Sequence, residues 1–317
     1  MVCEKIYRER FLEEILIAFE KDGITEKLDY LILTGSFGRN EPTFIQENDT
    51  IKYLSDLEII FAPKRKNAFS IDLIDELNKK YSKQFCIEFN IMLFSKKRIE
   101  KRLNYNHTLK NKYVTLLTYD VFKGSKFIIG NANEREDSFI IDKYEGKKLI
   151  CNRLAEWYIN KENGDMLSDL QWKSKILLAV STAYLVFNDS YASSYKKQNQ
   201  LFNEINVLFD NEQTSIINNA FDFLRVSGKP YRVTEDDIRK IIKIFLSKYD
   251  LKIKSKTQRL VFKLKVAKRA IGKKRLSYAF TCGGVVDKIY ENLLYSFLEQ
   301  DTVCFDKYCK IWKELIY

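Results

Sequence analysis

The chain has 317 residues, of which 45% are hydrophobic and 14% aromatic, and its formal net charge is +11. A single hydrophobic core rarely serves more than about 250–300 residues, so this length predicts two domains. No apolar run approaches the ~20 residues that cross a bilayer, and the N-terminus is too charged for a secretory signal. The six cysteines lack paired zinc spacing and the density of a disulfide scaffold. We therefore expect a cytoplasmic protein without a transmembrane segment, whose thiols are reduced and partly buried.

The N-terminal part of the chain alternates helix and strand patterns. Residues 4–20 have apolar residues at near-helical spacing and stop before Gly23, which predicts a helix. Leucine-rich and β-branched runs predict strands at residues 28–34 and 53–61. We interpret residues 41–52, between these strands, as an inserted loop, because they contain turn-forming residues and loop length costs little entropy.

The next elements continue this alternation. Ser70 is the predicted cap of an amphipathic helix over residues 70–82, and a strand is predicted at residues 85–94. Residues 111–130 have the pattern of a short helix, a turn and a last β segment. His107 is the only histidine, and we interpret it as a loop or helix-start residue, with a general base as the alternative. No cysteine or second histidine near it suggests a metal site.

From about residue 145 the pattern changes to long amphipathic stretches. Helices are predicted at residues 144–160, 169–188, 198–209, 212–226, 234–249, 256–271 and 285–316. Their leucine and aromatic stripes are the expected core of a helix bundle. The sequence therefore predicts an α+β fold, in which a small mixed-sheet domain at residues 1–140 is followed by an α-helical bundle domain at residues 141–317.

The most informative stretch is LILTGSFGRNE, residues 31–41, followed by YLSDLEIIF, residues 53–61. Side chains alternate along a strand, so Asp56 and Glu58 are expected to share one face. Two such acids repel each other unless a cation lies between them, and Mg²⁺ held by carboxylates and substrate phosphates is the usual case. A Gly-Ser turn alone is common, and an acid-x-acid strand alone is usually a solvated face. Their order favours a phosphate cradle facing a metal site.

This arrangement resembles the nucleotidyltransferase superfamily, which includes DNA polymerase beta, kanamycin nucleotidyltransferase and poly(A) polymerase. Gly35 and Ser36 match the family's Gly-Ser turn, and Asp56 and Glu58 match its pair of acids one residue apart. The gap between the two parts is longer here than the family's usual dozen residues. The family carries a third acid on a later strand, and the candidate in FCIEFNIMLF is Glu88.

The resemblance implies transfer of a nucleoside monophosphate from an NTP such as ATP to an acceptor, with release of pyrophosphate. Asp56 and Glu58 would hold two Mg²⁺ ions, for which Mn²⁺ can substitute. Glu88 would complete the site of the metal that lowers the pKa of the acceptor, and would be placed to accept its proton. The catalytic domain would be residues 1–140, and residues 141–317 would bind the acceptor.

The resemblance also suggests the phosphate contacts. The backbone amides of Gly35 and Ser36 would hold the β and γ phosphates, because glycine permits close approach and unpaired N–H groups attract anions. The Ser36 hydroxyl would add one more donor. Arg39 is either a further phosphate contact or a surface residue.

The acceptor is open at this point. A helical C-terminal half is similar to that of kanamycin nucleotidyltransferase, which favours a small molecule or sugar-type metabolite. The alternatives are a nucleotide or RNA end, a protein side chain as in AMPylating enzymes, and a catalytically silent member that binds polyanions. The oligomeric state cannot be deduced from the sequence.

Residues 252–275 contain eleven Lys and Arg residues, and no acid lies between Asp250 and Asp287. Leu260, Leu264 and other apolar residues recur inside this range at helical spacing, which predicts a basic helix with one apolar stripe. Its outer face is either solvated lysine or a contact for RNA, another polyanion or an anionic membrane surface. If the helix lines the cleft, it would instead hold triphosphate or an acidic acceptor. Aromatic residues that would stack on bases are sparse, which argues against sequence-specific RNA recognition.

Overall fold

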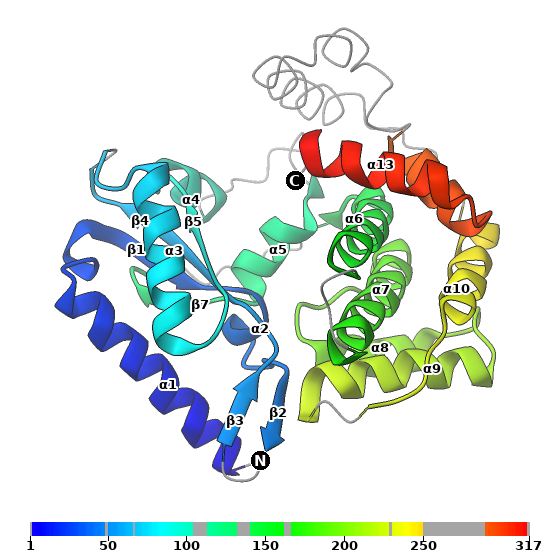
Figure 1. The fold of residues 1–317 in the computed structure, drawn as a ribbon, viewed down its shortest axis with the longest axis horizontal. Coiled ribbons are helices and arrows are strands. Elements are labelled where there is room, and N and C mark those ends of the chain that lie inside the picture. The colour runs from blue at the N-terminus through cyan, green and yellow to red at the C-terminus, as the bar shows by residue number, and fades with distance from the viewer. Residues whose placement is uncertain are drawn as a thin grey trace, which may run out of the picture. The chain divides into compact units, whose positions relative to one another are not determined.

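The computed structural model describes residues 2–47, 50–65, 67–103, 113–131, 140–161, 166–227, 230–249 and 289–315. Helices and a small mixed sheet make up this structure (Figure 1), so the α+β class is confirmed. The chain forms two compact units. Unit 1 consists of residues 1–142 with residues 192–199 and 221–229, and unit 2 contains the remainder.

The sheet of unit 1 has four strands in the order β5-β4-β1-β7. These strands are β1 (Leu28–Leu33), β4 (Leu57–Pro63), β5 (Phe89–Leu93) and β7 (Lys126–Ile129). Strand β1 is antiparallel to β4 and β7, whereas β4 and β5 are parallel. The C-terminal end of β1 therefore lies at the same edge of the sheet as the N-terminal ends of the other three strands.

Helices cover both faces of this sheet. The helices of unit 1 are α1 (Val2–Lys21), α2 (Gly35–Gly38), α3 (Ile71–Phe85), α4 (Lys96–Leu103) and α5 (Leu116–Lys123), with a 3₁₀ turn at Thr25–Lys27. As predicted, Ser70 caps α3, because its hydroxyl accepts a hydrogen bond from the Leu73 N–H at 3.1 Å. The connection from β4 through α3 to β5 is the crossover that a parallel strand pair requires.

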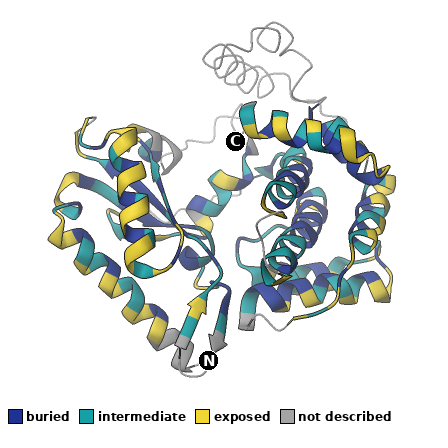
Figure 2. Ribbon diagram, viewed as in Figure 1, coloured by how far each residue is buried: buried dark blue, intermediate teal, exposed yellow. Residues whose placement is uncertain are grey.

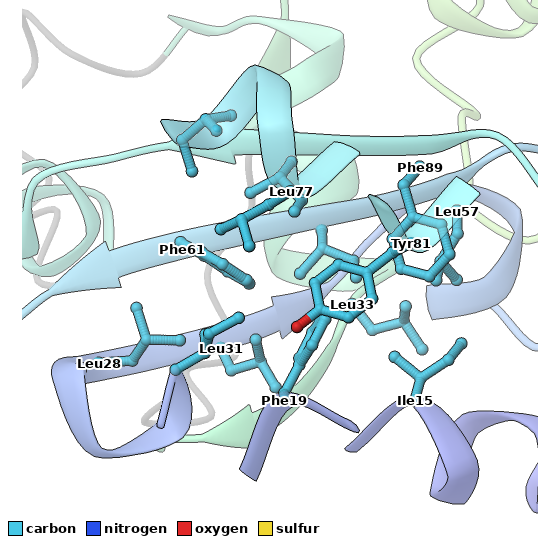
Figure 3. Packing of buried hydrophobic residues seen from close by; sticks show 14 of the residues in the cluster. Ile15, Phe19, Leu28, Leu31, Leu33, Leu57, Phe61, Leu77, Tyr81 and Phe89 are labelled. Carbon is cyan, nitrogen blue, oxygen red and sulfur yellow. The ribbon is translucent and has the colours of Figure 1, made fainter. Parts of the chain in front are cut away.

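The main core of unit 1 lies between the sheet and helices α1 and α3 (Figure 3). Phe19 from α1, Tyr81 from α3, and Leu31 and Phe61 from the sheet meet there, each at most 2% exposed. A smaller cluster on the opposite face contains Ile32 and Ile60 with side chains from α4 and α5. Burial on both faces explains why β1 and β4 are continuous apolar runs in the sequence.

The expected loop at residues 41–52 is wrong in part. Strands β2 (Phe44–Glu47) and β3 (Thr50–Tyr53) pair antiparallel as a hairpin. The pairing is compatible with the β-branched and aromatic residues of both segments. The expected strand at residues 53–61 is correspondingly divided between β3 and β4. A further pair, β6 (Tyr113–Val114) and β8 (Ile140–Ile141), is parallel.

The second half of the chain is helical in its described part. Its helices are α6 (Tyr144–Asn160), α7 (Met166–Phe187), α8 (Tyr195–Ile205), α9 (Asn211–Asp222), α10 (Glu235–Lys248), residues 289–298 and α13 (Thr302–Leu315), with a π-helical turn at Phe223–Ser227. Most of α7 is buried (Figure 2). Gly146 of α6 allows close packing, because a Cβ there would lie 2.8 Å from the Cα and Cβ atoms of Ala183.

The single helix expected at residues 285–316 is interrupted. Gln300 has φ 59°, and the Asp301 carboxylate accepts a hydrogen bond from the Cys304 N–H at 3.0 Å. A left-handed residue followed by an Asp cap ends one helix and starts the next. The predicted helix at residues 256–271, the basic range 252–275 and His107 all lie outside the described residues.

Cys86, Cys151, Cys304 and Cys309 are free thiols, of which Cys151 and Cys309 are buried and Cys86 is exposed. Burial raises the pKa of Cys151 to about 12 and also raises that of Cys309, so neither is a reactive thiolate at neutral pH. Among the described residues no helix is both long and apolar enough to cross a membrane.

Candidate functional site

The candidate site is built on the edge of the sheet where β1 ends and β4 and β5 begin. The Thr34 N–H donates to the Glu58 carbonyl at 3.0 Å, and the Leu57 N–H donates to the Glu88 carbonyl at 2.8 Å. These bonds extend the strand pairing by one step at each ladder. The Gly-Ser turn and the acids predicted from the sequence therefore belong to three neighbouring strands at one edge.

The Gly35-Ser36 turn lies directly against Glu58. Gly35 has φ +64°, which is the left-handed region, and a Cβ added to it would lie 2.0 Å from Glu58 Oε2 and 2.9 Å from Glu58 Cδ. Any residue larger than glycine would therefore displace this carboxylate. Glycine at this position is explained both by the backbone conformation and by the close approach of the acid.

The rest of α2 fixes the turn to the unit. Phe37 is fully buried in the main core, and its ring centroid lies 5.0 Å from that of Tyr53. A Cβ at Gly38 would lie 2.5 Å from the Leu33 carbonyl oxygen and 2.9 Å from that of Gly124. In the segment GSFG, the buried Phe37 ring therefore holds the turn in the core. Gly35 permits the close approach of Glu58, and Gly38 permits that of the neighbouring backbone carbonyls. The first amides of α2 have no partner within the helix, as at every helix start.

Asp56 follows Ser55, which exchanges two hydrogen bonds with Thr43. The Thr43 N–H donates to Ser55 Oγ at 2.8 Å, and the Ser55 N–H donates back to the Thr43 carbonyl at 3.3 Å. Thr43 and Ser55 are buried, whereas Asp56 and Glu58 are half-buried. No hydrogen bond or ion pair links the Asp56 carboxylate to another residue that the structure describes. The backbone at the base of the acid pair is therefore fixed while the Asp56 carboxylate stays partly accessible.

Strand register relates the third acid to the pair. Glu58 is opposite Asn90 in the parallel β4–β5 ladder and Leu57 is opposite Phe89, so the same register continued by one residue places Asp56 opposite Glu88. Glu88 is exposed and precedes β5, whereas Asn90 is half-buried. Within the described ranges, no three His, Cys, Asp or Glu side chains gather closely enough to hold a metal ion. The structure brings Glu58 to the turn, and joint ligation by Asp56, Glu58 and Glu88 stays a prediction.

Arg39 takes part in a different set of contacts. Its Cζ atom lies 4.7 Å from the centre of the Tyr195 ring, and its Nε atom lies 4.0 Å from Glu41 Oε2. The Arg39 side chain is only 9% exposed. These contacts give Arg39 a packing role beside the turn, and its predicted phosphate contact remains a prediction.

The sequence interpretation missed Glu41 and Thr43. Both were assigned to an inserted loop, yet the Glu41 N–H donates to the Ser36 carbonyl at 2.8 Å, and the buried Thr43 hydroxyl donates to the Leu224 carbonyl at 2.7 Å. An acid directly after a Gly-Ser turn was the available signal for Glu41. Nothing local indicates a partner about 180 residues away for Thr43.

Comparison with known proteins adds no assignment. No protein-family model matches this chain, and no curated protein matches it. The resemblance to nucleotidyltransferases noted in the Gly-Ser turn and the acid pair therefore stays a prediction.

Proposed function

We propose that this chain is a magnesium-dependent nucleotidyltransferase. It would transfer a nucleoside monophosphate from an NTP to an acceptor hydroxyl or phosphate. A bond forms between the acceptor oxygen and the α-phosphorus, the bond from that phosphorus to the bridging oxygen breaks, and pyrophosphate leaves. The proton of an acceptor hydroxyl would pass to Glu88. The observation that carries the proposal is the approach of Gly35 to Glu58, at which a Cβ would lie 2.0 Å from the carboxylate oxygen.

This approach supports the proposal because phosphate and metal must be neighbours in such a reaction. A helix start whose first amides have no partner within the helix attracts anions, whereas a carboxylate repels them. A turn that binds phosphate can lie beside the Glu58 carboxylate if a cation separates the carboxylate from the phosphate. A residue larger than glycine at position 35 would separate the two groups.

The donor set fits Mg²⁺. This ion usually takes one or two carboxylates and completes its octahedron with water and substrate phosphates, so a cage of three acidic side chains is not required. Asp56 and Glu58 would be the protein ligands, and Glu88 would contribute on the acceptor side. When bound, Mg²⁺ neutralises charge on the triphosphate and lowers the pKa of the attacking hydroxyl. Gly35 and Ser36 would orient the β and γ phosphates through their backbone amides.

A small molecule or sugar-type metabolite is the proposed acceptor class, on the resemblance of the helical half to kanamycin nucleotidyltransferase. An RNA end or a protein side chain would give a different labelled product. These classes are separated by incubating the purified protein with each α-labelled NTP and Mg²⁺ or Mn²⁺, with and without cell extract. Label in a small molecule supports the proposed class, and label in RNA or protein identifies the alternatives.

The decisive test is metal-dependent pyrophosphate release by the wild type and by the variants Asp56→Asn and Glu58→Gln. Both substitutions keep side-chain size and remove one charge. We expect each to lower the rate more than about a hundredfold, because several kcal/mol of charge stabilisation are lost. Asp75→Asn and Glu76→Gln are matched controls, since both acids are exposed on α3. Equal rates for all five proteins would exclude the proposed site.

A further inference from the structure

Glu41 connects the Gly-Ser turn to a distant part of the chain. Its N–H donates to the Ser36 carbonyl at 2.8 Å, while its carboxylate accepts three hydrogen bonds from the start of α8. Glu41 Oε1 accepts from Ser194 Oγ at 2.8 Å and from the Lys196 N–H at 3.1 Å, and Oε2 accepts from the Tyr195 N–H at 2.7 Å. Residues 192–199 belong to the same compact unit as Glu41.

The hydrogen bonds between the Glu41 carboxylate and residues 194–196 are stronger than those of an ordinary surface side chain. A carboxylate at a helix N-terminus is stabilised by charge-assisted hydrogen bonds and by the helix dipole. The Glu41 side chain is only 12% exposed, and Arg39 Nε lies 4.0 Å from Oε2. Water and salt therefore screen this interaction less than they would screen a surface ion pair. Glu41 caps α8 from a position more than 150 residues earlier in the sequence.

Residues 41–43 make further long-range hydrogen bonds at Thr43. The Thr43 hydroxyl donates to the Leu224 carbonyl, and the Thr43 backbone bonds to Ser55, the residue before Asp56. Residues 41–43 are thus held at both ends. They join the end of α2, whose first two residues carry the predicted phosphate amides, to the backbone that carries the predicted metal ligands.

We propose that Glu41 is a positioning residue for the triphosphate. It touches no reacting atom, and this inference depends on the proposed function. By holding the end of the α2 turn to residues 194–196, its carboxylate keeps the amides of Gly35 and Ser36 in place beside Glu58. Loss of this carboxylate loosens the turn and weakens NTP binding, while the acids that support the chemical step remain. The Michaelis constant for NTP therefore changes more than kcat.

The test compares Glu41→Ala and Glu41→Gln with wild type in two measurements. Hydrogen–deuterium exchange of residues 35–41 reports on the turn whether or not the protein is active. Steady-state pyrophosphate release with ATP and Mg²⁺ separates KM from kcat. Glu41→Ala is expected to raise exchange in the turn and to raise KM roughly tenfold. Glu41→Gln keeps one acceptor oxygen but places an amide donor against an N–H, so we expect an intermediate effect, and it serves if Glu41→Ala does not fold.

Thr234→Ala is the matched control. Thr234 caps α10, and its hydroxyl accepts a hydrogen bond from the Asp237 N–H at 3.1 Å. Its loss removes a helix cap in unit 2, and we expect neither faster exchange at residues 35–41 nor a higher KM. A KM that rises equally in Thr234→Ala would show that general destabilisation is responsible.

The outcomes separate this inference from the proposed function. Faster exchange in the Glu41 variants with a higher KM supports the positioning role. Faster exchange with an unchanged KM overturns that role and leaves the transferase proposal intact. Unchanged exchange overturns the role of Glu41 regardless of activity. A wild type that releases no pyrophosphate from any NTP overturns the transferase proposal, and the positioning role with it.

Discussion

Two glycines of unit 1 have nearly the same backbone conformation in different surroundings. Gly23 follows α1 with φ +63° and has nothing within 4 Å of an added Cβ, whereas Gly35 has φ +64° and an added Cβ would meet the Glu58 carboxylate. Gly23 is therefore required only by the backbone that ends α1. Gly35 is required by the backbone and also by the acid next to it, so the two positions can be used to separate these effects.

We predict that Gly35→Ala and Gly23→Ala cost similar stability but differ in activity. Each places a side chain in the left-handed region, which costs about 1–2 kcal/mol. The atom that meets the new methyl group at Gly35 is the end of a flexible side chain, so Glu58 is displaced while the backbone costs of the two substitutions are alike. Pyrophosphate release should then fall sharply in Gly35→Ala alone. Urea unfolding and the release assay check the pair, and equal activity would remove Glu58 from the site.

The same comparison shows what the sequence reveals about single residues. The pattern TGSFG followed by DLE was sufficient to predict that Gly35 and Glu58 belong together. The sequence did not reveal which carboxylate approaches the turn, because this depends on the register of β4 against β1. It also did not reveal Glu41 as a cap, because its partners at residues 194–196 are more than 150 positions away. Local patterns predict a chemistry, whereas long-range pairing determines the geometry.

At the scale of elements, hydrogen bonds of Asp22 link the end of α1 to α3, the two helices that cover the main core. Asp22 follows α1, and its carboxylate accepts hydrogen bonds from Lys80 and Tyr81 of α3. The Lys80 and Tyr81 hydrogen bonds hold the pKa of Asp22 below its ordinary value of 3.8. Burial, and then the bond to Asp22, raises the pKa of Tyr81, so its hydroxyl stays protonated and donates.

The lowered pKa of Asp22 predicts that its hydrogen bonds contribute to stability in a pH-dependent way. A carboxylate with a lowered pKa in the folded state stabilises the fold above its unfolded pKa, and the contribution is lost as the pH falls through the folded value. Wild type should therefore exceed Asp22→Asn in free energy of unfolding at neutral pH, and the difference should shrink below about pH 4. Urea titrations of both proteins across this range measure it. A difference that is constant with pH would contradict a charged role for Asp22.

Elements with strong periodicity were predicted well, and irregular ones were not. Helix α6 begins and ends where the sequence indicated, because its apolar stripe is a local feature. The hairpin of β2 and β3 was missed because its strands are only four residues each and lie among turn formers. The break at residues 299–301 was missed because Gln300 is an unusual residue in the left-handed conformation. Short strands and non-glycine helix ends depend on tertiary contacts that periodicity does not contain.

At the scale of the whole molecule, the described chain forms a unit that contains the sheet and a unit that is mainly helical. The boundary between these units does not fall at a single point of the sequence. Residues 192–199 and 221–229 come from the helical half of the sequence but belong to unit 1. Ligand binding at the sheet edge is therefore expected to stabilise unit 1 as a whole, including these returning segments. This expectation can be measured without knowing the acceptor.

We predict that a non-hydrolysable ATP analogue with Mg²⁺ raises the melting temperature of the wild type. At a concentration one hundred times Kd, a ligand that binds only the folded state adds about 2.7 kcal/mol. For a unit of this size the corresponding shift is roughly 5–10 °C. EDTA should remove the metal-dependent part, and Asp56→Asn or Glu58→Gln should abolish it, because the carboxylates would bind the nucleotide only through the ion. Equal shifts with and without Mg²⁺ would show that the nucleotide binds without these two acids, and the proposed site would have to be abandoned.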